Sequence, residues 1–372
     1  MPACSALTSR TINALRFPCA VLVVLIHLFK PVPEETFPYG FFRTLEIALS
    51  DGLARIAVPI FFFISGYLFF SKLQRWDWSA YSLKIKKRIK TLLVPYLLWV
   101  TLAILFDFSL ALVRNRFFGW GSPWNLFSSN GWGLMYWNCA RNRLYTSEMN
   151  LLGWTTHSAF PYNYPLWFIR DLIVLCLFAL LIHFAIRKTK GWGIAVLYAL
   201  YLLQIWIPWE GFSAEGWFFF SLGACLQIEG KDPATVFTRF KVPSYLLFIL
   251  ALVLCIRTHE NPIVWGYARR FLALPGTIVA FNVFSSLLDK GILRDRPFLS
   301  ECSFPVFAAH TIGLTFISEL LATKLIPGTG DASLFLQYLF RLLLIIAIIL
   351  IIYRWAKRLF PKVTALFTGN RS

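Results

Sequence analysis

Residues 12–29 read INALRFPCAVLVVLIHLF, an apolar run with one arginine near its start and one histidine near its end. A run of roughly 18 apolar residues is long enough to be a transmembrane helix. The chain continues with KPVPEE and offers no small-residue cleavage site after the run. We therefore interpret residues 12–29 as a retained first membrane span rather than a signal peptide, with the N-terminus on the cytoplasmic side.

Nine further apolar runs follow along the chain. Most of the backbone inside a bilayer has to be helical, because lipid offers no hydrogen-bond partners. The sequence thus predicts an all-α, polytopic integral membrane protein with about ten transmembrane helices. No internal repeat or low-complexity linker is evident, so we expect one membrane-embedded domain over residues 1–372. The expected spans are residues 12–29, 45–70, 92–112, 166–186, 192–209, 213–228, 243–256, 265–288, 304–323 and 334–353.

The composition excludes the soluble classes of protein. Apolar residues make up 58% of the chain and charged residues only 15%, whereas ordinary globular chains carry roughly 45–50% and about 25%. So few charges cannot cover a water-soluble surface. The same composition excludes a disordered chain and a coiled coil. The seven cysteines are scattered without CxxC or Cys–His spacing, so we expect neither a zinc site nor a disulfide framework.

The net charge of +18 comes from 36 Lys and Arg against 18 Asp and Glu. In a soluble protein this excess would indicate nucleic-acid binding, but in a membrane protein it indicates cytoplasmic loops. With the N-terminus inside, alternating segments place 22 basic residues inside and 8 outside. We therefore expect both termini in the cytoplasm, a lipid bilayer as surroundings, and no nucleic-acid partner.

Two ionisable residues lie in the first span. Arg16 and His27 are 11 residues apart, which is about three helical turns and ~16 Å along the axis, nearly on one face. Ionisable groups at membrane depth usually face a cavity or each other. One polar face would thus connect the inner surface to a deep imidazole. The alternative is that Arg16 snorkels to the interface and His27 caps it.

Other spans add charges and a point of close packing. Asp51 and Arg55 are spaced i, i+4 and can pair on one helix face. Ser65-Gly66 offers a close approach to a neighbouring helix. Asp171, in PLWFIRDL, lies at about the depth of His27 and could orient it or balance its charge. The same carboxylate could instead pair with one of four arginines: Arg170, Arg55, Arg269 or Arg270.

His310 is a second imidazole, in FPVFAAHTIGLTF, and we expect it in the cytoplasmic half of the ninth span. The alternative is a helix-contact histidine without a chemical role. The chain contains no HExxH, GxSxG, P-loop or GxGxxG motif, so no metal, nucleotide or serine-hydrolase site is predicted.

These motifs together resemble the acyltransferase-3 family of integral-membrane acyltransferases, of which many members are O-acetyltransferases. The matching features, in order, are Arg16 with His27, VPIFFFISGYLFF, KKRIKTLLVPYLLW, PLWFIRDLIVL, FFFSLGACL and FPVFAAHTI. The resemblance implies about ten helices, an acyl-CoA donor (usually acetyl-CoA) taken from the cytoplasm, and O-acylation of a cell-surface or lipid-linked glycan. With it we expect the cytoplasmic membrane of a bacterial cell as the location. Acyl-CoA is a co-substrate in such a reaction, and no bound cofactor is implied.

The resemblance also implies roles for particular residues. His27 matches the essential histidine of the family, and Arg16 matches its paired arginine. A neutral histidine suits a general base that deprotonates a hydroxyl. Asp171 is the second catalytic candidate because of its expected depth, and its partner stays open. Many members carry Arg-x-x-Arg in the basic loop, whereas here Arg88 is followed three residues later by Thr91. Lys87 and Lys90 could replace the missing arginine as point charges only.

We assign the remaining candidates to the two substrates. The expected donor-binding residues are Arg16, Ser65, Lys87, Arg88, Lys90 and His310. Phosphate favours such basic clusters, although the cluster at 84–90 is equally explained as a topology signal.

The outer loop, residues 113–165, holds five Trp, and aromatic faces stack on sugar rings. The expected acceptor-binding residues are Trp132, Trp137, Trp167 and Arg55. The alternative for the tryptophans is an interfacial aromatic belt. The alternative for the whole chain is a transporter or flippase of a glycan or small anion, which should show paired broken helices and internal symmetry.

Overall fold

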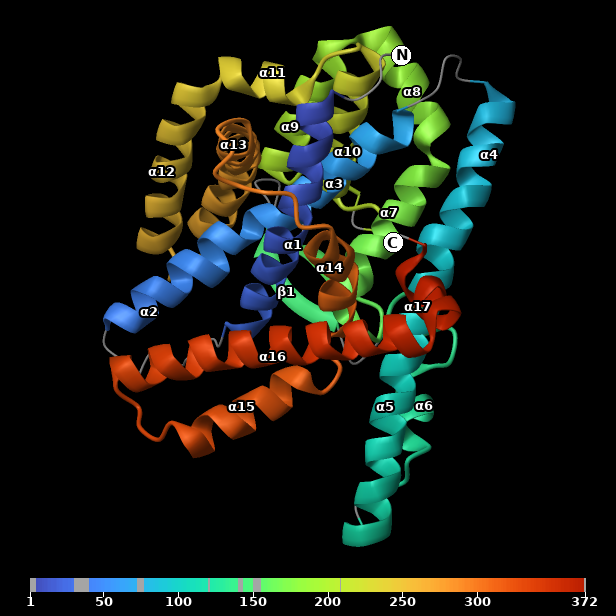
Figure 1. The fold of residues 1–372 in the computed structure, drawn as a ribbon, viewed down its shortest axis with the longest axis vertical. Coiled ribbons are helices and arrows are strands. Elements are labelled where there is room, and N and C mark those ends of the chain that lie inside the picture. Colours follow the sequence, from blue (N-terminus) through green and yellow to red (C-terminus); the bar gives the residue numbers. More distant parts are fainter. Residues whose placement is uncertain are drawn as a thin grey trace.

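The computed structural model describes residues 5–29, 40–71, 77–119, 121–139, 143–149, 155–207 and 209–370, with 143–149 and 155–158 described by their backbone alone. Helix α1 runs through the middle of the molecule, where it contacts α3, α13 and α14 (Figure 1). Helices α15 and α16 lie side by side, and α5 extends away from the rest of the molecule. The residues predicted to carry chemistry on α1 therefore lie inside the helical assembly.

The fold class predicted from the sequence is confirmed, because the described chain is almost entirely helical. The α-helices are α1 (Ala6–Leu28), α2 (Phe41–Glu46), α3 (Ala57–Phe70), α4 (Trp78–Arg88), α5 (Val94–Phe118), α6 (Asn125–Asn130), α7 (Trp167–Leu177), α8 (Ala179–Thr189), α9 (Gly191–Leu203), α10 (Ala214–Ile228), α11 (Pro233–Arg239), α12 (Lys241–Arg257), α13 (Pro262–Asp289), α14 (Pro297–Ala309), α15 (Leu314–Leu325), α16 (Asp331–Leu359) and α17 (Pro361–Thr368). Short π- and 3₁₀-helical turns, such as Leu53–Ile56, join some of them.

Each expected span coincides with at least one helix, but the helices differ in length and straightness. Within the described ranges, five are long and apolar enough to cross a membrane: Ala6–Leu28, Phe41–Phe70, Trp78–Phe118, Pro262–Asp289 and Asp331–Leu359. The number rises to eight if each of three bent pairs forms one span. Two of these pairs, α7 with α8 and α14 with α15, bend by 65° and 88°. The exact number of spans and the side of the termini stay predictions.

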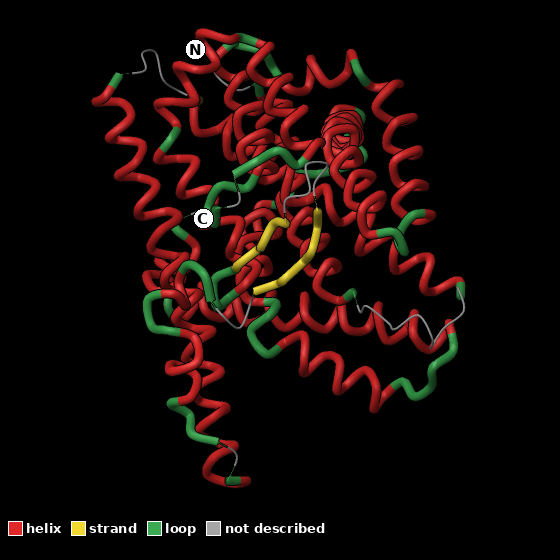
Figure 2. Tube along the Cα trace, turned by 180° about the vertical axis from the view of Figure 1, so that it is seen from behind, coloured by secondary structure: helices red, strands yellow, loops and turns green. Residues whose placement is uncertain are grey.

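Two features of the chain were not predicted. The fifth expected span, 192–209, ends early, because α9 stops at Leu203 and Gln204 adopts a left-handed conformation with φ 56°. Strands β1 (Arg143–Met149) and β2 (Thr155–Ala159) form an antiparallel hairpin within the expected outer loop (Figure 2). The segment after α9 and this hairpin both lie next to the candidate site described below.

The core depends on a close approach of two helices. Gly66 on α3 faces the backbone of Phe220 on α10, and Gly223 on α10 faces the backbone of Phe63 on α3. A Cβ atom at either glycine would collide with a carbonyl oxygen of the partner helix. Small residues at such crossings let helix backbones meet in membranes. The close approach expected at Ser65-Gly66 is therefore present.

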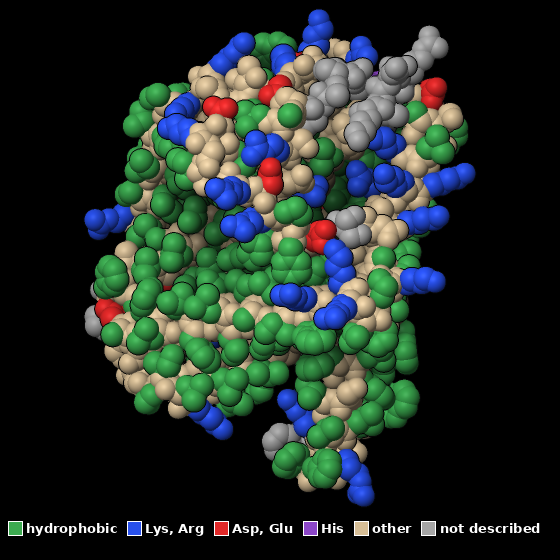
Figure 3. Space-filling view, viewed as in Figure 1, with side chains coloured by type: hydrophobic (Ala, Val, Ile, Leu, Met, Phe, Trp, Pro, Cys, Tyr) green, Lys and Arg blue, Asp and Glu red, His purple; other side chains and the backbone are tan. Residues whose placement is uncertain are grey.

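The surface carries large apolar side chains that no other part of the described chain covers. On α16, Leu343, Ile351 and Ile352 are all more than half exposed. Figure 3 shows hydrophobic side chains over the middle and lower part of one face, with Lys and Arg mainly on its upper half. Apolar area of this extent on a protein surface marks contact with another apolar medium. The exposed apolar helices thus agree with a membrane protein.

Candidate active site

Two cavities lie along α1, and two ionisable residues of that helix, Arg16 and His27, open into different ones. The smaller, of about 120 Å³, is lined by Arg16 and is called here the donor-side pocket. The larger, of about 650 Å³, is lined by His27 and is called here the histidine cavity. The single polar face predicted for α1 therefore connects two separate spaces.

The imidazole of His27 is held between two other rings. Its Nδ1 lies 2.6 Å from the hydroxyl oxygen of Tyr164. On another side, His310 stacks on it with ring centroids 4.9 Å apart and an interplanar angle of 18°. Two neighbours at these distances fix both the plane and the position of the His27 ring. Tyr164 was missed by the sequence analysis, although it directly precedes PLWFIRDL.

His310 lies beside His27, not among the residues that line the donor-side pocket, where the sequence analysis had assigned it. It follows directly after α14, at the start of the 88° bend between α14 and α15. Its Nδ1 lies 3.1 Å from the carbonyl oxygen of Val306, so Nδ1 is the donor. Its Nε2 is buried without a hydrogen-bond partner among the described residues.

Asp171 lines the histidine cavity but bonds to residues other than His27. Its Oδ1 accepts from Arg170 Nε at 3.0 Å, and its Oδ2 accepts from the Ser213 amide at 3.3 Å. Arg170 in turn donates to the carbonyl oxygens of Trp137 and Ala159. Among the four arginines that the sequence left open as partners of Asp171, the structure shows Arg170 bonded to it. The hydrogen-bond partner of His27 is Tyr164, not Asp171. Asp171 therefore ties α7 to the loop before α10.

The histidine cavity combines aromatic and charged side chains. Trp167 and Arg55, two of the predicted acceptor-binding residues, line it. Arg55 also donates to Asp51 at 2.9 Å, so the pair predicted from the i, i+4 spacing is present. His259 contacts the other oxygen of Asp51 at 3.1 Å. A charged network on the second expected span thus borders the cavity.

Neither of the other two predicted acceptor residues lines the cavity. Trp132 is 64% exposed and stacks on Phe127 with centroids 3.9 Å apart. Trp137 has the guanidinium of Arg170 5.4 Å from its ring centroid. Trp120 and Trp154 of the same loop lie outside the described residues.

Tryptophans from other segments take the place of Trp132 and Trp137. Trp206 and Trp209 come from the segment between α9 and α10, and Trp265 comes from α13. Two glutamates also line the cavity: Glu210 from the segment between α9 and α10, and Glu215 from the first turn of α10. The sequence analysis missed Trp206 and Trp209 because it had placed residues 192–209 inside a span. The signal that could have revealed it is the dense run Trp206, Trp209, Glu210 around Pro208.

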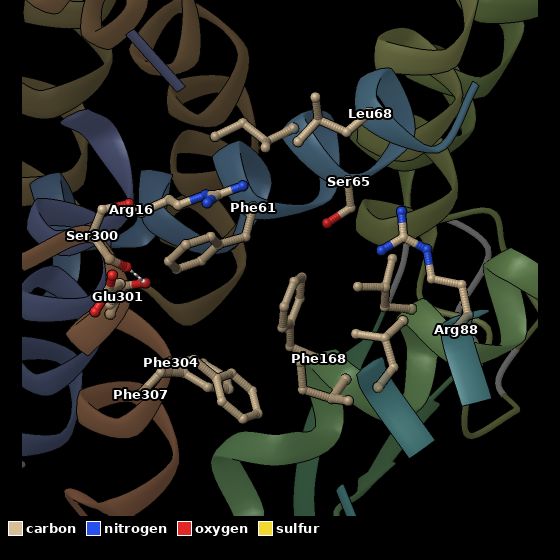
Figure 4. A pocket seen from close by; sticks show the side chains of 15 residues that line it. Arg16, Phe61, Ser65, Leu68, Arg88, Phe168, Ser300, Glu301, Phe304 and Phe307 are labelled. Atoms are coloured by element: carbon tan, nitrogen blue, oxygen red, sulfur yellow. Dashed lines mark hydrogen bonds between the residues drawn. The ribbon is translucent and has the colours of Figure 1, made fainter. Parts of the chain in front are cut away.

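The donor-side pocket contains part of the predicted donor set. Arg16 and Arg88 lie on opposite sides of it, with Ser65 between them (Figure 4). Glu301 also lines the pocket, but Lys357 neutralises its carboxylate at 2.5 Å. The pocket therefore offers two guanidinium groups and the hydroxyls of Ser65, Ser300 and Ser303 to an anionic ligand.

Lys87 and Lys90 do not line the donor-side pocket and are exposed. They lie near the junction of α4 and α5, where Arg88 points inward and its guanidinium lies 5.4 Å from the Phe69 ring centroid. In the part of the chain that the structure describes, no three His, Cys, Asp or Glu residues are placed to hold a metal ion.

Comparisons with known proteins agree with the resemblance noted from the motifs. A family model described as an acyltransferase domain, of the acyltransferase-3 type, matches residues 10–354. The chain is 24% identical over 376 residues to the succinoglycan biosynthesis protein ExoH of Rhizobium meliloti (strain 1021). That match covers 98% of this chain and 93% of the relative. No solved structure matches the chain significantly.

Proposed function

This chain belongs to the acyltransferase-3 family of membrane acyltransferases, and from that premise we propose that it transfers an acyl group, with acetyl as first choice, from cytoplasmic acyl-CoA to a hydroxyl of a cell-surface or lipid-linked polysaccharide. The relative named for succinoglycan biosynthesis supports a polysaccharide acceptor. The cytoplasmic membrane is the location that gives such an enzyme access to both substrates.

The proposed chemistry is centred on His27. With Nδ1–H donating to the Tyr164 oxygen, Nε2 is left as the base. It removes the proton from the acceptor hydroxyl while the hydroxyl oxygen attacks the thioester carbonyl carbon. A new C–O ester bond forms, the C–S bond breaks, and the proton on His27 passes to the departing thiolate to give free CoA. His310 and Tyr164 are positioning residues in this scheme, because they hold the imidazole.

The donor-side pocket supports the donor half of the proposal. Guanidinium groups bind phosphate oxygens in pairs of charge-assisted hydrogen bonds, and CoA carries three phosphates. Arg16 and Arg88 on opposite walls suit the phosphorylated end of such a ligand (Figure 4). Acyl-CoA is a co-substrate here, so the proposal needs no bound cofactor.

The histidine cavity supports the acceptor half. A cavity of about 650 Å³ is within the size range of small-molecule sites. Trp206, Trp209 and Trp265 offer aromatic faces to sugar rings, and Glu210 offers a hydrogen-bond acceptor to hydroxyl groups. The acceptor would therefore meet the base directly, without crossing the donor-side pocket.

The observation that carries the proposal is the imidazole of His27, held by Tyr164 and His310 at the wall of a cavity large enough for a sugar. The test uses purified protein in proteoliposomes with radiolabelled acetyl-CoA and an exopolysaccharide oligosaccharide. Wild-type protein is expected to yield labelled oligosaccharide, and His27→Ala to lose at least about 10²-fold of that rate. The matched control is His183→Ala, which removes a buried histidine that lines neither cavity.

A second pair of variants tests the acceptor site. Trp209→Ala is expected to raise the Michaelis constant for the oligosaccharide with little change in that for acetyl-CoA. Trp132→Ala, outside the cavity, is expected to change neither constant. If wild-type protein moves the oligosaccharide across the bilayer without acylating it, the chain is a flippase and the proposal is wrong.

A further inference from the structure

Phe307 belongs to the lining of both cavities. Among the described residues, it is the one side chain that the donor-side pocket and the histidine cavity share. On one side of it lie Arg16 and Arg88, and on the other lies His27. The boundary between the proposed donor site and the proposed base is therefore made at least partly of one phenyl ring.

Two more phenyl rings complete this boundary. Phe61 from α3 and Phe168 from α7 lie with their centroids 5.7 Å apart, and each also contacts Phe307 from α14, at 6.2 and 5.7 Å. The three rings thus come from three different helices and touch in every pairing. Figure 4 shows Phe61 and Phe168 facing the space between Arg16 and Arg88. We call these three residues the aromatic partition.

The partition conflicts with the proposed reaction as long as it stays closed. The phosphates of acyl-CoA would lie with the arginines, whereas the thioester carbon must come within reach of His27. The phosphates and the thioester are joined by the pantetheine arm, which is a narrow and flexible chain. Such an arm needs only a narrow opening between the two cavities. Transfer therefore requires the three rings to move apart.

The helix that carries Phe307 has a weak point at the right place. Pro305 lies inside α14, so the backbone hydrogen bond that its nitrogen would donate to Glu301 is missing. Phe307 follows two residues later, and His310, stacked on His27, lies one turn beyond it. A movement of this turn would displace the partition and the neighbour of the base together.

We propose that Phe61, Phe168 and Phe307 form a gate for the acyl-bearing arm of the donor and that the width of its opening limits the acyl group that is transferred. This inference rests on the proposed acyl-CoA-dependent function. It adds that the partition is a specificity-determining element, distinct from the phosphate-binding arginines and from the base.

The test compares acetyl-, butyryl- and hexanoyl-CoA as donors, with transfer measured as kcat/KM for each. Phe307→Ala is expected to raise the hexanoyl-to-acetyl ratio at least about tenfold over wild type, because it widens the opening. Phe61→Ala is expected to act in the same direction. Phe307→Leu, which keeps more apolar bulk, is expected to give a smaller increase and serves if the alanine variant does not fold.

Phe281→Ala is the matched control, since Phe281 is a fully buried phenyl ring that packs on Phe63 and Phe237 outside both cavities. An unchanged chain-length ratio in folded Phe307 and Phe61 variants, or an equal change in Phe281→Ala, overturns the gate while leaving the acyltransferase function intact. Absence of transfer from any acyl-CoA by wild-type protein overturns the proposed function and the gate with it. The two failures are therefore distinguishable.

Discussion

At the scale of single residues, the hydrogen bond between Tyr164 and His27 joins positions 137 residues apart in the sequence. Tyr164 begins a short 3₁₀ turn, Tyr164–Leu166, that leads into α7. The place of its hydroxyl thus depends on how α7 packs against the rest of the molecule. A hydrogen bond of this kind contributes about 0.5–1.5 kcal/mol and fixes the orientation of the ring.

Removal of that hydroxyl should reveal a positioning role. We expect Tyr164→Phe to lower kcat about tenfold while the Michaelis constant for acetyl-CoA stays near wild type, because the imidazole loses its orientation but donor contacts persist. The pH profile of kcat should also change, since the partner of His27 Nδ1 is gone. Tyr162→Phe is the control, because Tyr162 bonds to Asp107 and lines neither cavity. An equal loss in both variants would indicate a merely structural role.

The basic loop separates into residues with different environments. Arg88 lines the donor-side pocket, whereas Lys87 is exposed. We expect Arg88→Gln to raise the Michaelis constant for acetyl-CoA about tenfold, most clearly at low ionic strength. Lys87→Gln should change it less than about twofold, because an exposed charge is screened by salt. If both changes affect the Michaelis constant equally, Arg88 has no specific role in donor binding and the basic loop is explained as a topology signal.

At the scale of elements, the crossing of α3 and α10 positions several side chains that line the two cavities. Ser65 and Phe61 lie on the same helix as Gly66, and Glu215 lies in the first turn of α10, the helix that carries Gly223. The backbones meet so closely that no side chain fits between them. The crossing therefore sets the distance between the walls of the donor-side pocket and the start of α10.

A methyl group at this crossing should loosen the whole site. We expect Gly66→Ala to lower Tm in detergent by about 5 °C or more, since its Cβ would press on the Phe220 carbonyl, which cannot give way as a side chain would. Gly191→Ala is the control, because nothing lies within 4 Å of a Cβ placed there. A variant at Gly66 as stable as wild type would show that the two helices can separate without cost.

The bend between α14 and α15 begins only after His310. The sequence analysis expected His310 in the cytoplasmic half of a single ninth span, on the donor side. His310 instead directly follows α14 with a helical backbone, and its imidazole stacks on that of His27. Gly313, with φ 72°, precedes α15, and a Cβ atom there would collide with the ring of Phe106. The packing of α14 against α1 therefore places the pair of imidazoles.

At the scale of the whole molecule, the sequence predicted what depends on local periodicity. Arg16 and His27 lie on one helix with fixed rise and rotation per residue, so their alignment could be worked out without the fold. The pair Asp51–Arg55 follows from the same reasoning. Family motifs then directed attention to Ser65 and Arg88. All of these lie at one of the two cavities or at its border.

The rest could not be predicted because it depends on contacts between distant segments. Trp206 and Trp265 reach one cavity from a loop and a helix that lie about 60 positions apart in the sequence. Trp132 and Trp137 satisfied the same aromatic criterion, yet neither of them lines this cavity. An abundance of tryptophan shows that sugar or interface contacts are possible, whereas the packing of helices decides which tryptophans face the base.

The arrangement of both cavities along α1 predicts the sidedness of the reaction. If Arg16 is near the cytoplasmic end and His27 is toward the outer end, acyl-CoA and acceptor should be required on opposite faces of the membrane. In proteoliposomes sorted for one orientation, acetyl-CoA on the face of the exposed Lys87 and oligosaccharide on the other face should give product. The reverse placement should give none, because CoA is too highly charged to cross the bilayer. Product formed only when both substrates share one face would contradict the two-sided arrangement, and with it the assignment of the histidine cavity to an external acceptor.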